Sequence, residues 1–287
     1  DSKLNSVITL TEKLAIKQAR KMDREIKAGN YRSSLHGIPW GAKDVIAKSG
    51  YRTTWGAKAY RNQVIDYDAT LVSRLEEAGA VLIAKLSTGE IARGDRWFDK
   101  QTRNPWKINE GSGGSSAGPG SATAAGLVGF SIGSDTTGSI LGPSRTCGIS
   151  GLRPTFGRIS RHGVMPVCWS LDKVGPMCRS VEDCAIVFQS IHGPDNQDLS
   201  LVDMPFNWNG NKNLKELRIG YIEEAFNENT HPNDMETLEC LRRMGAELQP
   251  IRLPKHAGMD ALQMLLVDEA AAFDELIQTG KVDLFLQ

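Results

Sequence analysis

Two short strings carry the residues of this chain that are best suited to chemistry: GSGGSSAG at 111–118 and GSDTTGS at 133–139. Glycine lets the main chain approach a ligand closely, and a serine hydroxyl can act as a nucleophile or pass on a proton. Upstream, the string HGIPWGAKD places Lys43 at the start of a segment that continues, after Asp44, with the apolar run Val45-Ile46-Ala47, where a lysine would be partly stripped of water. Serines together with a desolvated lysine indicate a hydrolase with a catalytic loop system.

The order of the motifs along the chain is also distinctive. They are GIPWGAKD (37–44), GGSSAG (113–118), GSDTTGSI (133–140) and the segments 147–160 and 170–183. In this order the chain resembles the amidase signature family, which includes bacterial amidases, fatty acid amide hydrolases and the A subunit of glutamyl-tRNA amidotransferases. The resemblance implies an α/β amidase-signature fold, with a central mixed β-sheet covered by helices on both faces. It also implies that residues 1–287 form a single domain that lacks the C-terminal part of the family fold.

The resemblance further assigns roles to individual residues. It implies that Ser139 is the nucleophile and that Ser115, in a position typically preceded by a cis peptide, bridges it to the base Lys43. It implies an oxyanion hole made by the backbone amides of Thr136, Thr137, Gly138 and Ser139. No cofactor and no metal ion are expected.

The base imposes a physical requirement on this arrangement. A lysine in solution has a pKa of about 10.4 and is protonated, so it cannot accept the proton of a serine. Burial can lower the pKa of a lysine by roughly 3 to 5 units, which brings it to the value of about 7 to 8 that suits a base near neutral pH. We therefore expect Lys43 to lie in a largely buried pocket.

Three positions depart from the commonest family pattern. Ala117 stands in place of the second glycine of GGSSGG, Thr137 in place of the first glycine of GSDTGGS, and Leu141 where an arginine often follows GGSI. Thr137 keeps its amide, so the predicted oxyanion hole is retained. Leu141 removes a positive charge near the site and weakens the case for the tRNA amidotransferase branch.

These residues predict an amidohydrolase that cleaves a linear carboxylic acid amide to the acid plus ammonia or an amine, through an acyl-enzyme on Ser139. Two alternatives stay open: the A subunit of an Asp/Glu-tRNA amidotransferase that releases ammonia from glutamine, and a catalytically silent fragment of the same fold. The geometry of Lys43 discriminates between an active and a silent chain, because a silent copy has no reason to keep a neutral lysine near Ser115.

Other motifs in the chain have weaker interpretations. Residues 114–118 match the GxSxG nucleophile elbow and would make Ser116 the nucleophile, but the preceding residues are too polar for the required strand. Ser170 and Lys173 match an SxxK motif without the accompanying KTG, and 133–138 has the glycine spacing of a phosphate loop without its lysine. The five histidines lie in unrelated contexts and are expected to be structural.

Composition limits the classes of partner. The 34 basic and 34 acidic side chains leave no net charge, so nothing favours nucleic acid or an anionic membrane as a partner. The chain has no apolar run of about 18 residues and no signal-peptide pattern. Five cysteines without CxxC spacing are expected to be free thiols in a reducing compartment, so we predict a cytoplasmic protein whose start at Asp1 reflects trimming or processing. The expected partner is a small-molecule amide, and a homodimer is compatible with the sequence.

Hydrophobic spacing predicts the elements that must position these residues. The alternation of charges predicts an amphipathic helix over 3–27, and hydrophobic spacing predicts a helix over 68–79 with Asp68 as its N-cap. The predicted strands are 80–84, 127–132, 217–222 and 247–253, with helices over 234–244 and 260–279 and a surface connection at 207–213. Asp172 and Arg158 are predicted to be structural supports. Trp169 and Met165 are candidates for the acyl pocket or for core packing.

Overall fold

The computed structural model describes residues 1–227, 230–254 and 258–284. Contacts within the chain group into two compact units. Unit 1 contains residues 1–206 together with the segment from 263 onward, and unit 2 contains residues 207–262. The prediction of one domain that lacks part of the family fold stays a prediction.

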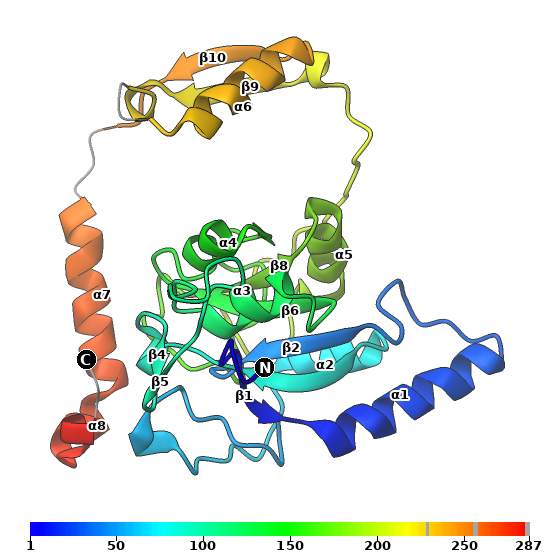
Figure 1. Ribbon diagram of the computed structural model, residues 1–287, viewed down its shortest axis with the longest axis vertical. Coiled ribbons are helices and arrows are strands. Elements are labelled where there is room, and N and C mark those ends of the chain that lie inside the picture. The colour runs from blue at the N-terminus through cyan, green and yellow to red at the C-terminus, as the bar shows by residue number, and fades with distance from the viewer. Residues whose placement is uncertain (228–229, 255–257, 285–287) are drawn as a thin grey trace. The chain divides into compact units, whose positions relative to one another are not determined.

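Unit 1 is built around a six-stranded mixed sheet (Figure 1). In spatial order its strands are β1 (Val7–Leu10), β3 (Val81–Leu86), β2 (Pro39–Lys43), β6 (Phe130–Asp135), β8 (Lys173–Cys178) and β7 (Ser150–Gly151). The three central strands β3, β2 and β6 are parallel, whereas β1, β8 and β7 pair antiparallel to their neighbours. The central parallel strands therefore end on the same side of the sheet, where ligands bind in open α/β sheets.

Five helices from the first part of unit 1 pack against these strands. They are α1 (Glu12–Lys27), α2 (Thr70–Glu77), α3 (Ala117–Ala124), α4 (Leu141–Cys147) and α5 (Val181–Ile191). Helices α2 and α5 contact each other over the larger apolar core, which includes Trp40, Leu75 and Phe188. Helix α3 contacts α4 and buries Ala122 in a second, smaller cluster with Ala84 and Leu86 of β3. The α/β class and the mixed central sheet are confirmed.

Most of the elements expected in the first half are present with shifted ends. The predicted helix 68–79 and strand 80–84 correspond to α2 and β3, and the predicted strand 127–132 corresponds to β6. Asp68 is not the N-cap of α2, because its carboxylate instead accepts hydrogen bonds from Lys48 Nζ and the amide of Ser49. A helix throughout 3–27 is wrong, since residues 7–10 form the edge strand β1. The sequence Val-Ile-Thr there consists of β-branched residues, which favour strands.

Unit 2 is a βαβ motif formed by β9 (Arg218–Ile222), α6 (Pro232–Arg243) and β10 (Glu247–Ile251). Its two strands are parallel, and these three elements confirm the predictions for 217–253. Residues 207–213 contain no helix or strand, as predicted.

The predicted helix 260–279 is divided into α7 (Gly258–Ala272) and α8 (Asp274–Gln278). The break lies at Phe273, which is buried and meets Trp55 edge to face, with ring centroids 6.2 Å apart. The side chain of Phe273 thus packs in the core of unit 1, and the helix is interrupted at this residue.

The remaining elements are short. They are the hairpin β4 (Arg96–Trp97) and β5 (Lys100–Gln101) and the 3-10 helices η1 (Lys58–Tyr60), η2 (Glu90–Ala92), η3 (Leu214–Glu216), η4 (Glu223–Ala225) and η5 (Lys281–Leu284). No helix within the described ranges is long and apolar enough to cross a membrane.

Candidate active site

Lys43 is the last residue of β2, at the carboxyl end of the parallel strands. Its side chain is fully buried, as predicted. The Nζ atom lies 2.8 Å from Ser115 Oγ and 2.9 Å from Ser134 Oγ. Burial lowers the pKa of Lys43 to about 7, although the charges of Asp135 and Asp172 act in the opposite direction. A large fraction of the lysine is therefore a neutral amine near neutral pH, and it can accept a proton.

Ser115 lies two residues before the start of α3 and is also buried. The Gly114-Ser115 peptide bond is cis, and the Ser115 carbonyl accepts hydrogen bonds from Thr88 Oγ1 and the amide of Gly89. Gly114 has no room for a side chain, because a Cβ atom there would lie 1.8 Å from the carbonyl oxygen of Gly94. The glycines of the GGSSAG string thus allow the chain to pass close to its neighbour and bring Ser115 to Lys43.

Ser139 follows β6 in the loop that leads to α4. The buried carboxylate of Asp135 holds this loop, accepting hydrogen bonds from the amides of Gly138 and Ile140, both at 2.7 Å. The carbonyl of Ser139 accepts a hydrogen bond of 3.1 Å from the amide of Ser116. That bond joins the two serine-rich strings, so the three residues predicted from the sequence lie in neighbouring segments.

Four backbone amides were predicted to form an oxyanion hole, and they differ in availability. The amide of Gly138 already donates to Asp135 Oδ1. Within the described residues, the amides of Thr136, Thr137 and Ser139 donate no hydrogen bond. Thr137 is exposed and Ser139 is half-buried. Three of the four predicted donors are thus free to bind an oxygen atom.

Two residues of this site were not singled out by the sequence analysis. Ser134 contacts Lys43 Nζ through its hydroxyl, and Asp135 organises the loop that carries Ser139. Both belong to the GSDTTGS string. The position of Asp135 could have indicated its role, because an aspartate at the end of a buried strand is well suited to accept hydrogen bonds from the amides of the turn that follows.

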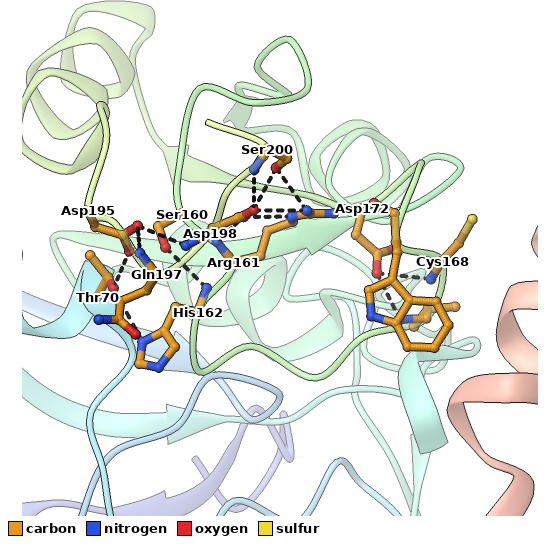
Figure 2. A network of polar contacts seen from close by, with 12 residues as sticks. Thr70, Ser160, Arg161, His162, Cys168, Asp172, Asp195, Gln197, Asp198 and Ser200 are labelled. Carbon is orange, nitrogen blue, oxygen red and sulfur yellow. Dashed lines mark hydrogen bonds and ion pairs between the residues drawn. The ribbon is translucent and has the colours of Figure 1, made fainter. Parts of the chain in front are cut away.

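A cavity of about 250 Å³ adjoins these residues. Ser134 and Thr136 line one side, and Met165, Trp169 and Leu199 contribute apolar surface. Trp169 and Met165 both line this cavity, and Met165 also packs in the main core, so that the acyl-pocket role of the two residues stays a prediction. Figure 2 shows the polar network along its rim, in which Arg161 pairs with Asp198 at 2.9 Å.

Asp172 is a structural support, as predicted. Its Oδ2 atom accepts hydrogen bonds from the amides of Val167 (2.8 Å) and Cys168 (2.9 Å), and its Oδ1 atom accepts one from Thr136 Oγ1 at 2.6 Å. Arg158, also predicted to be a support, donates to the carbonyls of Met204 and Pro205.

Comparison with known proteins covers almost the whole chain. Residues 1–284 match the family described as Amidase. The chain belongs to this family. The A subunit of the glutamyl-tRNA(Gln) amidotransferase of Roseiflexus sp. (strain RS-1) is 42% identical to it over 265 residues, which are 88% of this chain and 54% of that relative. The chain spans about half the length of the curated relatives it matches.

Solved structures of the Amidase family have the same fold. The native peptide amidase of Stenotrophomonas maltophilia superposes with a TM-score of 0.84 at 36% identity, over 96% of this chain and 60% of that one. The A subunit of the glutamyl-tRNA(Gln) amidotransferase of Thermotoga maritima gives a TM-score of 0.79 at 28% identity, over 95% of this chain and 67% of that one.

The GxSxG match at 114–118 of this Amidase-family chain is a largely buried segment and not an exposed elbow. Ser116 is fully buried, and its hydroxyl donates to the carbonyl of Ser134 while accepting from the same residue's amide. A serine engaged in this way is poorly placed as an elbow nucleophile. In the described part of the chain, no group of three or more His, Cys, Asp or Glu side chains could hold a metal ion. The five cysteines are free thiols, as predicted.

Proposed function

We propose that this chain carries the machinery of an amidohydrolase that cleaves a linear carboxamide through an acyl-enzyme on Ser139. One observation carries the proposal: a fully buried lysine with a pKa of about 7 lies 2.8 Å from the hydroxyl of Ser115. A buried amine is destabilising when charged, and the arrangement has chemical use only if the amine accepts a proton.

The reaction follows from these positions. Ser139 Oγ attacks the amide carbon while its proton passes to Ser115 Oγ, and the proton of Ser115 passes to Lys43 Nζ. The carbonyl oxygen becomes an oxyanion, which accepts hydrogen bonds from the amides of Thr137 and Ser139. The same relay in reverse protonates the leaving nitrogen, so ammonia or an amine departs. Water then hydrolyses the acyl-enzyme by the same route and releases the acid. Each oxyanion donor is expected to contribute about 3 kcal/mol to the lowering of the barrier.

The proposal is tested by incubating the chain with a fluorophosphonate, followed by intact mass measurement and peptide mapping. We expect one adduct on Ser139, lost in Lys43→Ala and Ser115→Ala. Ser121→Ala is a matched control: this buried serine donates to the carbonyl of Arg103 and touches neither Lys43 nor Ser139. An adduct on Ser116 would replace the mechanism with a nucleophile elbow, and the absence of any adduct would favour a silent chain.

The A subunit of a tRNA amidotransferase is a second candidate, because the curated relative described above carries that name. Against it stands Leu141, where an arginine often follows the GGSI string of such subunits; it is 41% exposed at the start of α4. The test is hydrolysis of glutamine, measured as ammonia released with and without co-purified partner proteins. Ammonia release from glutamine that depends on a partner would favour the amidotransferase function over that of a free-standing amidase.

A further inference from the structure

Lys173 has no place in the mechanism above, yet it reaches the loop that carries Ser139. It is the first residue of β8 and pairs with Asp135 in the antiparallel β6–β8 ladder. Its side chain is half-buried, and Nζ donates a hydrogen bond of 3.0 Å to the carbonyl oxygen of Thr136. A second hydrogen bond from the same ammonium goes to the carbonyl of Leu171. The lysine therefore joins the start of β8 to the segment before the nucleophile.

The bond to Thr136 determines how the next peptide group points. A peptide unit is planar and trans, so the carbonyl of Thr136 and the N–H of Thr137 point in opposite directions. Because Lys173 holds the carbonyl on its side, the N–H of Thr137 points away from the lysine. In the described part of the chain this N–H has no acceptor. It is one of the two amides proposed to bind the oxyanion.

A neighbouring contact holds the same residue at a second point. Thr136 Oγ1 donates to Asp172 Oδ1 at 2.6 Å, and Asp172 is in turn fixed by the amides of Val167 and Cys168. Consecutive residues 172 and 173 therefore hold the side chain and the carbonyl of Thr136. Rotation of the peptide between Thr136 and Thr137 would break the bond from the ammonium.

We propose that Lys173 is a positioning residue, whose ammonium group orients and polarises the Thr136–Thr137 peptide so that the Thr137 N–H is presented to the developing oxyanion. The inference rests on the proposed function. A cation at the carbonyl withdraws electron density from the peptide and makes its N–H a stronger donor, as in other hydrogen-bonded chains. A donor that is aligned beforehand stabilises the transition state without reorganisation.

The experiment measures fluorophosphonate labelling of Ser139, which requires no known substrate. The saturating labelling rate kinact reports stabilisation of the phosphonyl oxygen in the transition state, and KI reports initial binding. For Lys173→Met we expect kinact to fall about 10-fold to 100-fold, with KI changed by less than about 3-fold. Lys173→Gln keeps a hydrogen-bond donor without the charge, and its kinact should lie between those of the unaltered chain and Lys173→Met. Lys173→Arg keeps the donor and the charge and should recover most of the labelling rate.

Lys48→Met is the matched control. Lys48 is buried and pairs with Asp68 at 2.6 Å, so its replacement also removes a lysine contact but none to the 134–139 loop. We expect it to lower the melting temperature without lowering kinact.

The possible results separate the two proposals. If Ser139 of the unaltered chain is not labelled, the proposed function fails and this inference fails with it. If Ser139 is labelled and Lys173→Met keeps its kinact, only the role of Lys173 is overturned. A change in KI alone, or equal losses in the Met and Arg variants, would likewise overturn it, because neither follows from support of the Thr137 amide by a cation.

Discussion

At the scale of residues, the site depends on the effects that set the pKa of one amine, that of Lys43. Burial removes the hydration of the Lys43 ammonium and lowers its pKa, whereas the carboxylates of Asp135 and Asp172 favour the charged form. Both carboxylates also accept hydrogen bonds from backbone amides. Burial dominates, and the resulting pKa of about 7 places the amine where it can both take and return a proton.

The first prediction concerns the pH dependence of labelling. Because the base must be neutral, we expect the fluorophosphonate rate on Ser139 to rise roughly tenfold per pH unit below the pKa of Lys43 and to level off above it. The midpoint should lie at about 7. Lys43→Arg, which stays charged, should be inactive across the range. A rate that does not depend on pH would contradict the role of Lys43.

The second prediction concerns stability. The pKa of Lys43 is about 7 in the folded chain, below the value of about 10.4 expected when the chain unfolds. Between these values the unfolded chain binds a proton that the folded chain does not, so stability rises with pH through this window. Lys43→Met removes this dependence. Between about pH 6 and about pH 10, the unfolding free energy of the unaltered chain should therefore rise by roughly 4 kcal/mol relative to that of Lys43→Met, measured by urea unfolding.

The third prediction concerns Ser134, whose hydroxyl accepts a hydrogen bond of 2.9 Å from Lys43. A hydrogen bond to an ammonium stabilises the charged form and is worth about 1.5 to 3 kcal/mol. In Ser134→Ala we therefore expect the midpoint of the pH profile to move down by about one unit. Ser131→Ala removes a buried hydroxyl that bonds to Thr123 and Pro119, and it should leave the midpoint in place.

Sequence reasoning placed Lys43 correctly in a buried position, because a lysine must lose its hydration to act as a base and because an apolar run follows at 45–47. It did not reveal Ser134 or Lys173, since their contacts depend on how strands pair. Ser134 reaches Lys43 because β2 and β6 are parallel neighbours, and Lys173 reaches Thr136 because β8 runs antiparallel to β6. The spacing of residues along the chain does not specify which strands are adjacent.

At the scale of elements, the site requires backbone segments to approach more closely than side chains allow. Gly133 in β6 is a second example besides Gly114, because a Cβ atom there would lie 2.7 Å from Ser116 Oγ. The strand and the start of α3 can therefore share the Ser116 hydroxyl. Parallel pairing of β3, β2 and β6 then brings their carboxyl ends, and the loops that follow them, to one edge.

The fourth prediction tests this close approach. In Gly114→Ala the new methyl group would meet the backbone of Gly94, which cannot move aside as a flexible side chain would. We expect a loss of about 1 to 3 kcal/mol in unfolding free energy and a large loss of labelling. In Gly142→Ala the nearest atom is 3.5 Å away and the residue lies in α4, so stability should be unchanged or up to about 1 kcal/mol higher. Equal effects of the two changes would contradict the packing argument.

Elements with a clear hydrophobic period were the most predictable. Helix α2 and strand β3 were located within a few residues, whereas β1 was included in a helix because charged residues alternate on both sides of it. The break between α7 and α8 could not be inferred either. It depends on Phe273 finding Trp55, more than two hundred residues earlier in the chain.

At the scale of the whole molecule, residues far apart in the sequence belong to the same unit. Phe273 and Leu276 lie in the main core together with Leu75 and Phe188. Residues 207–262, which lie between Phe188 and Phe273 in the sequence, form a separate unit. The stability of unit 1 therefore depends on a segment that follows unit 2 in the chain.

The fifth prediction follows from this division. Phe273→Ala should destabilise unit 1 by about 3 to 5 kcal/mol, seen as faster amide hydrogen exchange in β2 and β6. Leu238→Ala, which removes the buried leucine of α6, should speed exchange in β9 and β10 and leave β2 and β6 unchanged. If both variants altered exchange equally in both units, the two units would unfold together as one cooperative unit, which contradicts the prediction.

The order of the strands has a consequence for how the protein is made. All six strands of the main sheet lie between Val7 and Cys178, so the sheet has its full set of strands when the 95 residues from 179 to Phe273 are still to be added. At synthesis rates of about 5 to 20 residues per second, that interval is roughly 5 to 20 seconds. Lys43, Ser115 and Ser139 can therefore assemble on a growing chain before Phe273 exists to close the core.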